Sequence, residues 1–240
     1  SAVAGDNAID AGDGADQVVL QGGSNTVQGN SGTDSITITG GINVIDGGDD
    51  NDTVTLNAGL NTIAGGTGAD SITAVAGDNA IDAGEGADLV VLQGGSNTVQ
   101  GNAGADSIRA TGGPHVIDGG ADNDVIDLTL GSNTVAGGLG DDSIDLSGAE
   151  TTEFDVGPAI TSIETFNLTG GIANTLVLSR NSFERTLNGT LVGLSSTATG
   201  AISVLGDDND TLLLNGAWVK SNTAVNGLAQ YSLAHSTAGS

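Results

Sequence analysis

The stretch GGTGADSITAVAGDNAID, residues 65–82, contains the pattern that decides the fold. It consists of two nine-residue units, each with a Gly-containing half followed by alternating polar and apolar residues. Asp70 is followed two residues later by Ile72, and Asn79 is followed two residues later by Ile81. Gly favours tight turns, and alternation places every second side chain on one face of a strand. Each unit therefore predicts one turn and one short strand.

The same pair of units recurs along residues 1–146 without an insertion. A branched aliphatic residue follows two positions after each Asp of the series. Nine residues before each Asp comes a second series, in which Asn stands at seven positions and His115 at the eighth. The Asp series is Asp16, Asp34, Asp52, Asp70, Asp88, Asp106, Asp124 and Asp142, and the Asn series is Asn7, Asn25, Asn43, Asn61, Asn79, Asn97 and Asn133.

Repeats of this kind indicate a solenoid. Two units form one 18-residue coil, and successive coils stack as parallel strands in two facing sheets. We predict an all-β, right-handed parallel β-roll of eight coils over residues 1–146. Val18, Leu20 and their equivalents point inward from one sheet, and Ile9, Val27 and their equivalents point inward from the other. Outward positions carry residues such as Thr53 and Thr55, which suit a solvated sheet.

Composition sets the remaining limits. The chain has 240 residues and a formal charge of −26, which excludes nucleic acid and anionic lipid as direct partners. It has no Cys, so disulfides and thiolate metal sites are excluded. No apolar run is long enough to insert in a bilayer, and there is no N-terminal signal peptide. The sequence begins with Ser1 rather than Met, which is expected of a fragment or a processed chain. All five aromatic residues lie beyond residue 150. We therefore expect a separate β-rich cap or assembly region over residues 147–240.

The Asp-type turns carry the chemistry, in sequences such as GDGAD (12–16) and GTGAD (66–70). Stacked coils lie about 4.8 Å apart, so neighbouring aspartates would repel by roughly 1 kcal/mol even in water. Calcium takes six to eight oxygen ligands from carboxylates and carbonyls, which this edge offers. The turns resemble the nonapeptide G-G-x-G-x-D-x-U-x of RTX (repeats-in-toxin) proteins, which form calcium-binding β-rolls. The resemblance implies about seven Ca²⁺ ions between adjacent turns, bound by the eight aspartates of the series.

Asn replaces Asp on the opposite edge of the coil. We predict calcium on one edge and a hydrogen-bonded Asn ladder on the other. Weak residual calcium binding through carbonyl oxygens is the alternative for the Asn edge. His115 is read as a tolerated substitution in this ladder rather than as a zinc ligand. The additional acids in the Asp-type turns are expected to form a solvated acidic edge, and they are Asp13, Asp49, Asp50, Glu85, Asp122 and Asp141.

One further calcium turn is predicted in the C-terminal region. GDDNDTLLL (206–214) echoes GDDNDTVTL (48–56), so Asp210 is a ninth candidate ligand, although no phased partner accompanies it. The pattern around IETFNLTGG (163–171) is similar to the C-terminal regions of secreted RTX adhesins and surface-layer proteins. That similarity implies type I secretion, an extracellular location and self-assembly at the cell surface.

These observations favour a calcium-binding structural module of a secreted bacterial cell-surface protein, which folds on extracellular calcium. The sequence contains no nucleophile elbow, metalloprotease motif or phosphate loop, so we expect no enzymatic activity. Two alternatives remain open. The roll is also compatible with an accessory RTX module of a secreted enzyme. Thr26, Thr62, Thr98 and Thr134 recur on one face, which is compatible with an ice- or polysaccharide-binding solenoid.

Overall fold

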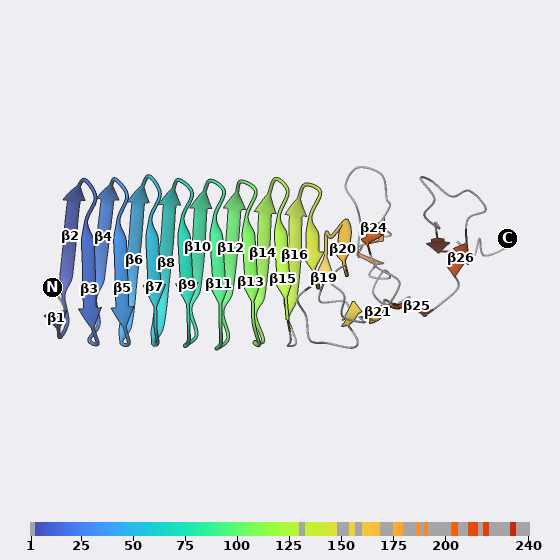
Figure 1. Cartoon of the computed structure of the whole chain (residues 1–240), viewed down its shortest axis with the longest axis horizontal. Helices are drawn as coiled ribbons and strands as arrows, with labels where there is room; N and C mark the ends of the chain where they lie inside the picture. Colours follow the sequence, from blue (N-terminus) through green and yellow to red (C-terminus); the bar gives the residue numbers. More distant parts are fainter. Residues whose placement is uncertain are drawn as a thin grey trace.

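The computed structural model of the chain is a β-solenoid with two long parallel sheets (Figure 1). It describes residues 3–129, 133–147 and 160–168 together with short strands at 154–156 and beyond residue 174, and side chains are described for 5–129, 133–147 and 160–168. No helix is present among these residues, and hence none that could cross a membrane. The all-β prediction and the stack of 18-residue coils are confirmed.

The first sheet has eleven strands, and those from β3 to β17 follow one another in steps of one 18-residue coil. They are β1 (Val3–Ala4), β3 (Gln17–Gln21), β5 (Ser35–Thr39), β7 (Thr53–Leu56), β9 (Ser71–Ala74), β11 (Leu89–Leu92), β13 (Ser107–Ala110), β15 (Val125–Leu128), β17 (Ser143–Asp145), β20 (Thr165–Asn167) and β24 (Ser203–Leu205).

The second sheet has nine strands, which run opposite to those of the first sheet in Figure 1. They are β2 (Ala8–Asp13), β4 (Thr26–Ser31), β6 (Ile42–Asp49), β8 (Leu60–Thr67), β10 (Ala80–Glu85), β12 (Thr98–Ala103), β14 (Val116–Ala121), β16 (Thr134–Leu139) and β19 (Ile160–Thr161). The remaining strands form a parallel trio, β18 (Phe154–Val156), β21 (Thr175–Ser179) and β25 (Thr211–Asn215), and two antiparallel pairs, β22 (Thr186–Leu187) with β23 (Thr190–Leu191) and β26 (Trp218–Lys220) with β27 (Tyr231–Leu233).

Residues that pair between neighbouring strands of the roll are 18 residues apart, so equivalent positions of the repeat lie side by side. Val18 pairs with Ile36, and Ile36 pairs with Val54. Each turn joins the two sheets, and the turns fall on two edges. We call the edge with the Asp series the Asp edge and the edge with the Asn series the Asn edge.

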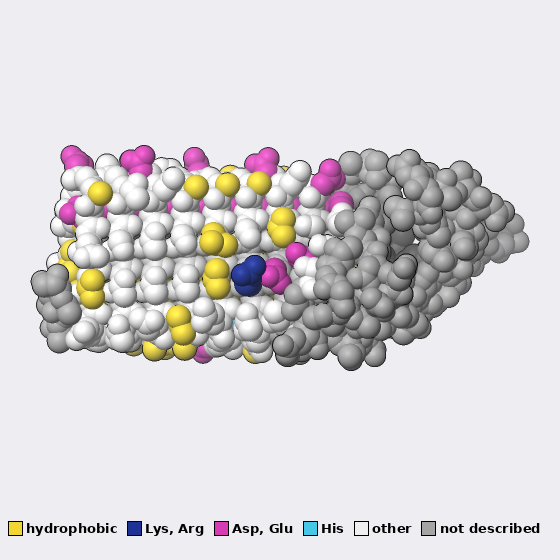
Figure 2. Space-filling view, viewed as in Figure 1, with side chains coloured by type: hydrophobic (Ala, Val, Ile, Leu, Met, Phe, Trp, Pro, Cys, Tyr) yellow, Lys and Arg dark blue, Asp and Glu magenta, His cyan; other side chains and the backbone are white. Residues whose placement is uncertain are grey.

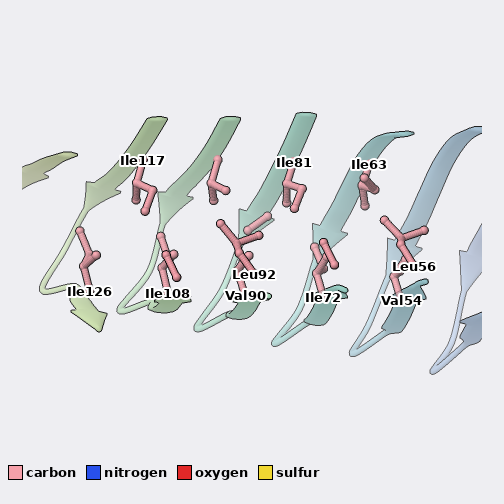
Figure 3. Packing of buried hydrophobic residues seen from close by; sticks show 14 of the residues in the cluster. Val54, Leu56, Ile63, Ile72, Ile81, Val90, Leu92, Ile108, Ile117 and Ile126 are labelled. Atoms are coloured by element: carbon pink, nitrogen blue, oxygen red, sulfur yellow. The ribbon is translucent and has the colours of Figure 1, made fainter. Parts of the chain in front are cut away.

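The core is a slab of aliphatic side chains between the two sheets (Figure 3). Val54, Leu56 and Ile72 point from the first sheet toward Ile63 and Ile81 of the second, and all five are at most 2% exposed. Burying each such side chain contributes about 1.5–3 kcal/mol. Because every coil adds inward aliphatic residues at the same positions, the core continues from coil to coil, as the period predicts.

The parallel stack continues past residue 146, but with a longer step. Ser143 of β17 pairs with Thr165 of β20, so the step grows from 18 to 22 residues. Phe166 occupies the inward position after Ile144 and is fully buried. An aromatic side chain therefore fits the slab at this rung, although residues 1–146 contain none. The division at residue 146 and the capping role of 147–240 stay predictions.

Candidate metal sites

The Asp edge holds a row of inward-pointing carboxylates. Seven of the eight aspartates, Asp34 to Asp142, are at most 2% exposed, and Asp16 at the open end is half-buried. The Oδ1 atom of each of these seven accepts a hydrogen bond of 2.7–2.9 Å from the backbone N–H of the aspartate one coil earlier. We call this row the Asp ladder. It brings together the eight aspartates of the Asp series, one per coil, out of the nine that the sequence predicts as ligands.

The second carboxylate oxygen of the ladder has no partner within the protein. Oδ2 is buried and makes no hydrogen bond in Asp34, Asp52, Asp70, Asp88, Asp106, Asp124 and Asp142. A buried carboxylate oxygen without a partner is costly, because it has lost its hydration and gained nothing in exchange. At a pH where the carboxyls are ionised, a positive charge beside the ladder would therefore stabilise it.

Backbone carbonyl oxygens lie next to these unpartnered atoms. A Cβ on Gly65 would lie 2.6 Å from Asp70 Oδ2, and a Cβ on Gly47 would lie 2.5 Å from Asp52 Oδ2. The carbonyl oxygen of Gly65 itself lies against Gly47, one coil earlier. The steps of the Asp edge therefore offer two ladder carboxylates with backbone carbonyls close by.

The pKa values of the ladder carboxyls reflect this burial. Burial raises the pKa of Asp52 and Asp88 to about 6, and neighbouring ladder aspartates add to the rise. Burial and the charges of Asp106 and Asp142 raise the pKa of Asp124 to about 7. No basic side chain relieves the repulsion in the described part of the chain. Arg109 is the single Lys or Arg with a described side chain, and it pairs with Asp127 on the outer face at 2.7 Å.

The Asn edge has the same geometry with an uncharged group. Asn Nδ2 donates to the Oδ1 of the next Asn along the row at 2.6–2.9 Å, from Asn7 through to Asn97. Nδ2 also donates to a turn carbonyl, as from Asn25 to Gly22 at 3.1 Å and from Asn97 to Gly94 at 2.9 Å. The amide N–H₂ thus takes the place of the Oδ2 atom that has no partner on the Asp edge, and unlike that atom it makes hydrogen bonds. The predicted Asn ladder is present.

The family model of the RTX calcium-binding nonapeptide repeat, built of four copies, matches the chain at residues 1–36, 28–63, 37–72, 55–90, 92–126 and 116–144. Together these matches cover more than half of the chain. The chain belongs to the RTX calcium-binding repeat family. Neither the curated proteins nor the solved structures contain a match.

RTX nonapeptide repeats bind calcium, and the residues of the Asp ladder fit that ion. Among the described residues, no group of three or more His, Cys, Asp or Glu side chains gathers around one point. With two carboxylates per step, the remaining ligands must come from backbone carbonyls. An all-oxygen set of carboxylates and carbonyls suits calcium, whereas zinc and copper prefer nitrogen and sulfur.

His115 is the one residue that interrupts the Asn ladder. Its side chain is 1% exposed, and Nδ1 faces the backbone N–H of Asn97 at 3.2 Å and the Asn97 amide nitrogen at 3.3 Å. Because both neighbours are donors, Nδ1 must accept, and burial lowers the pKa of His115, which favours the neutral ring. The His115 N–H still donates to Asn133 Oδ1 at 2.9 Å, so the ladder carries on beyond it. In the described part of the chain, His115 does not belong to any group of three or more potential metal ligands.

The additional acids lie outside the ladder, as predicted. Asp13, Asp49, Asp50, Glu85, Asp122 and Asp141 are all exposed. Figure 2 shows acidic side chains along one long edge of the roll. Asp210 lies outside the described residues, so its predicted calcium turn stays a prediction. The repeat pattern does not predict the buried acid Glu164, because this residue does not fall on the 18-residue period.

Proposed function

We propose that the chain is a calcium-binding structural module of a secreted bacterial cell-surface protein. In this proposal the ligands are the carboxylates of the eight Asp-edge aspartates and the carbonyl oxygens of the Gly-rich turns. The row of buried, unpartnered Oδ2 atoms carries the argument, since an electrostatic defect repeated in every coil needs one divalent cation per step. Seven such steps lie between Asp16 and Asp142.

Calcium then acts as a folding switch. Unfolded chains do not present the ladder, so calcium binds the folded roll preferentially and stabilises it by mass action. In low calcium the chain keeps its charge of −26, and about seven divalent ions bring it to roughly −12. Such a switch suits a protein that is exported unfolded and meets millimolar calcium outside the cell. Folding that depends on calcium therefore supports a secreted location and type I export.

The experiment compares the far-ultraviolet circular dichroism of the full chain in excess EGTA and in millimolar calcium. We expect the β signal to be lost in EGTA and to return when calcium is added. A chain that remains fully folded in EGTA and shows no rise in melting temperature with calcium would refute the proposal. Magnesium at the same concentration is the control, because its small octahedral shell does not fit a site built from several backbone carbonyls.

Assembly at the cell surface is the finer part of the proposal. The strand β2 ends the second sheet, so one of its edges has no strand partner among the described residues. An unpaired strand edge is a template for another chain. Sedimentation and electron microscopy with and without calcium test this part. Particles that remain monomeric at every calcium concentration would contradict self-assembly and leave calcium binding unaffected.

We infer no catalytic role for this chain. The roll is a structural calcium-binding module, and the regular spacing of its aspartates accounts for them without catalysis. Among the described residues, His115 is the single histidine, and it is enclosed in the Asn ladder. An esterase and peptidase screen of the calcium-loaded chain would reveal an activity that this inference does not expect.

A further inference from the structure

The roll gains one more rung after the last nonapeptide, and that rung has an unusual turn. β19 pairs with β16 through Ile160 and Val135, and β20 pairs with β17 through Thr165 and Ser143. The chain takes eight positions from Val135 to Ser143 but only five from Ile160 to Thr165. The turn between β19 and β20 is therefore three residues shorter than the Asp-edge turn below it. The family match ends at residue 144, so this rung lies outside it.

Glu164 takes the ladder position in this shortened turn. It immediately precedes β20, just as Asp142 immediately precedes β17. Glu164 Oε2 accepts the backbone N–H of Asp142 at 2.8 Å, within the range of the seven Asp-to-Asp contacts. The side chain is 7% exposed. Glu164 thus continues the Asp ladder by one step with a different residue type.

This step also has buried carboxylate oxygens without a hydrogen-bond partner. Glu164 Oε1 is buried and makes no hydrogen bond, and neither does the facing Asp142 Oδ2. The pKa of Glu164 is raised by burial, and the charges of Asp142 and Asp141 add to the rise. Among the side chains that the structure describes, no basic group compensates this charge, since the single one, Arg109, is paired with Asp127.

A carbonyl oxygen is also placed as in the nonapeptide turns. The Ser162 carbonyl lies against Gly137, as the Gly137 carbonyl lies against Gly119 and the Gly65 carbonyl against Gly47. Ser162 adopts a positive φ of 52°, which is uncommon for a residue other than Gly, Asn or Asp. The shortened turn therefore keeps the stacked carbonyl and the buried carboxylate, the two ligand types that the other steps offer.

We propose that Glu164 is a metal ligand, and that a further calcium ion lies between the last nonapeptide turn and residues 162–164. Its ligands include the carboxylates of Asp142 and Glu164 and the carbonyl of Ser162. The proposal rests on the proposed function, because it extends the same ladder by one site. Calcium at this step fastens the segment 160–168 to the roll, so the order of this segment depends on calcium.

The test counts calcium ions on the full chain by native mass spectrometry in calcium acetate, for the wild type and for Glu164→Gln. Gln can still accept the Asp142 N–H, and its amide can donate as Asn does on the Asn edge, so we expect the variant to fold. We expect Glu164→Gln to carry one calcium ion fewer than the wild type. Glu85→Gln is the matched control, because it removes the same charge from an exposed position on the same edge, and its count should be unchanged.

The outcomes separate this inference from the proposed function. A wild-type chain without calcium refutes the proposed function. A count that falls with Asp88→Asn but not with Glu164→Gln refutes this inference alone. Hydrogen exchange gives a second readout: calcium should protect residues 160–168 in the wild type but no longer in Glu164→Gln, while residues 53–72 stay protected in both. Should the variant fail to fold, a crystal structure of the wild type with every nonapeptide step filled and no ion at Glu164 overturns the inference.

Discussion

Asp88→Asn should change the stability of the roll in opposite directions with and without calcium. Asp88 lies in the middle of the Asp ladder, where its Oδ1 accepts the Asp70 N–H and its own N–H donates to Asp106 Oδ1, both at 2.8 Å. Asn keeps both of these contacts. It replaces the buried, unpartnered Oδ2 with an N–H₂ donor, as on the Asn edge.

The calcium-free magnitude follows from the pKa of Asp88, which is raised from 3.8 to about 6. Each unit corresponds to about 1.4 kcal/mol, so at pH 7.5 the ionised carboxylate destabilises the calcium-free roll by about 3 kcal/mol. Asn carries no charge, so we expect the variant to be about 3 kcal/mol more stable than the wild type without calcium.

The calcium-bound magnitude has the opposite sign. Asp88 belongs to the steps on both sides of it, so the substitution weakens two sites. At a calcium concentration about 100 times Kd, each site contributes about 2.7 kcal/mol of stability. Losing two sites therefore costs about 5 kcal/mol, which exceeds the gain from removing the charge.

Urea unfolding followed by far-ultraviolet circular dichroism measures the free energy of unfolding without and with calcium, which are the two arms of the test. All calcium-free samples contain the same concentration of a stabilising osmolyte, so that the folded state is populated before urea is added. Asp46→Asn is the control, because it removes one charge from an exposed position of β6 and should change neither arm by more than about 0.5 kcal/mol. The reasoning fails if Asp88→Asn behaves like this control, or if its effect has the same sign in both arms.

Three further outcomes are expected. In calcium-free buffer the roll should gain stability as the pH falls from 7.5 to 4, because the pKa values of Asp52 and Asp124 in the folded chain, about 6 and about 7, exceed the ordinary value of 3.8. This gain is lost as the pH rises through 6 to 7, and a loss of the β circular dichroism signal on acidification over this range would contradict the prediction. Gly66→Ala should lower the free energy of unfolding, measured in urea, by about 2 kcal/mol more than Gly12→Ala does. Both residues have positive φ, +115° and +95°, but only a Cβ on Gly66 would collide with a carbonyl of the preceding coil, so equal losses of stability would argue against close stacking. His115→Asn should stabilise the calcium-bound roll by about 1 kcal/mol, because it replaces the buried His115 Nε2, which has no partner, by an amide that completes the Asn ladder. A variant with a lower urea midpoint than the wild type would show that the packing of the ring contributes more than the missing hydrogen bond.

The sequence predicts most of the roll, because its two periods each have a direct physical meaning. Alternation within a unit determines which residues point inward, so the pattern alone assigns Val54, Leu56 and Ile63 to the core, where they lie. The spacing of 18 determines the register, so it places Asp70 and Asp88 one above the other. The contrast between Asp and Asn at the same repeat position then distinguishes the edge that needs a cation from the edge whose side chains hydrogen-bond to one another.

The last rung could not be predicted in the same way. Glu164 lies 22 residues after Asp142, so the period places nothing there, and only strand pairing shows that it continues the ladder. The step changes because the chain leaves the repeat after Ser147 and returns through a shorter turn at Ser162. The buried Phe166 has the same origin, since composition alone assigned every aromatic residue to a separate region.

The two ladders have different roles in folding: the Asn ladder helps to specify the register, and the Asp ladder makes the stability of the roll depend on calcium. The Asn ladder links successive coils through neutral hydrogen bonds, which need no ion and already have the 18-residue register. The Asp ladder has the same register but carries one buried charge per coil. Calcium therefore does not have to select the register of the roll, because the Asn edge and the aliphatic core specify it. What calcium controls is whether the register that the sequence encodes becomes stable. A chain with Asp on both edges would carry twice the buried charge per coil and would need about twice as many ions to reach the same state.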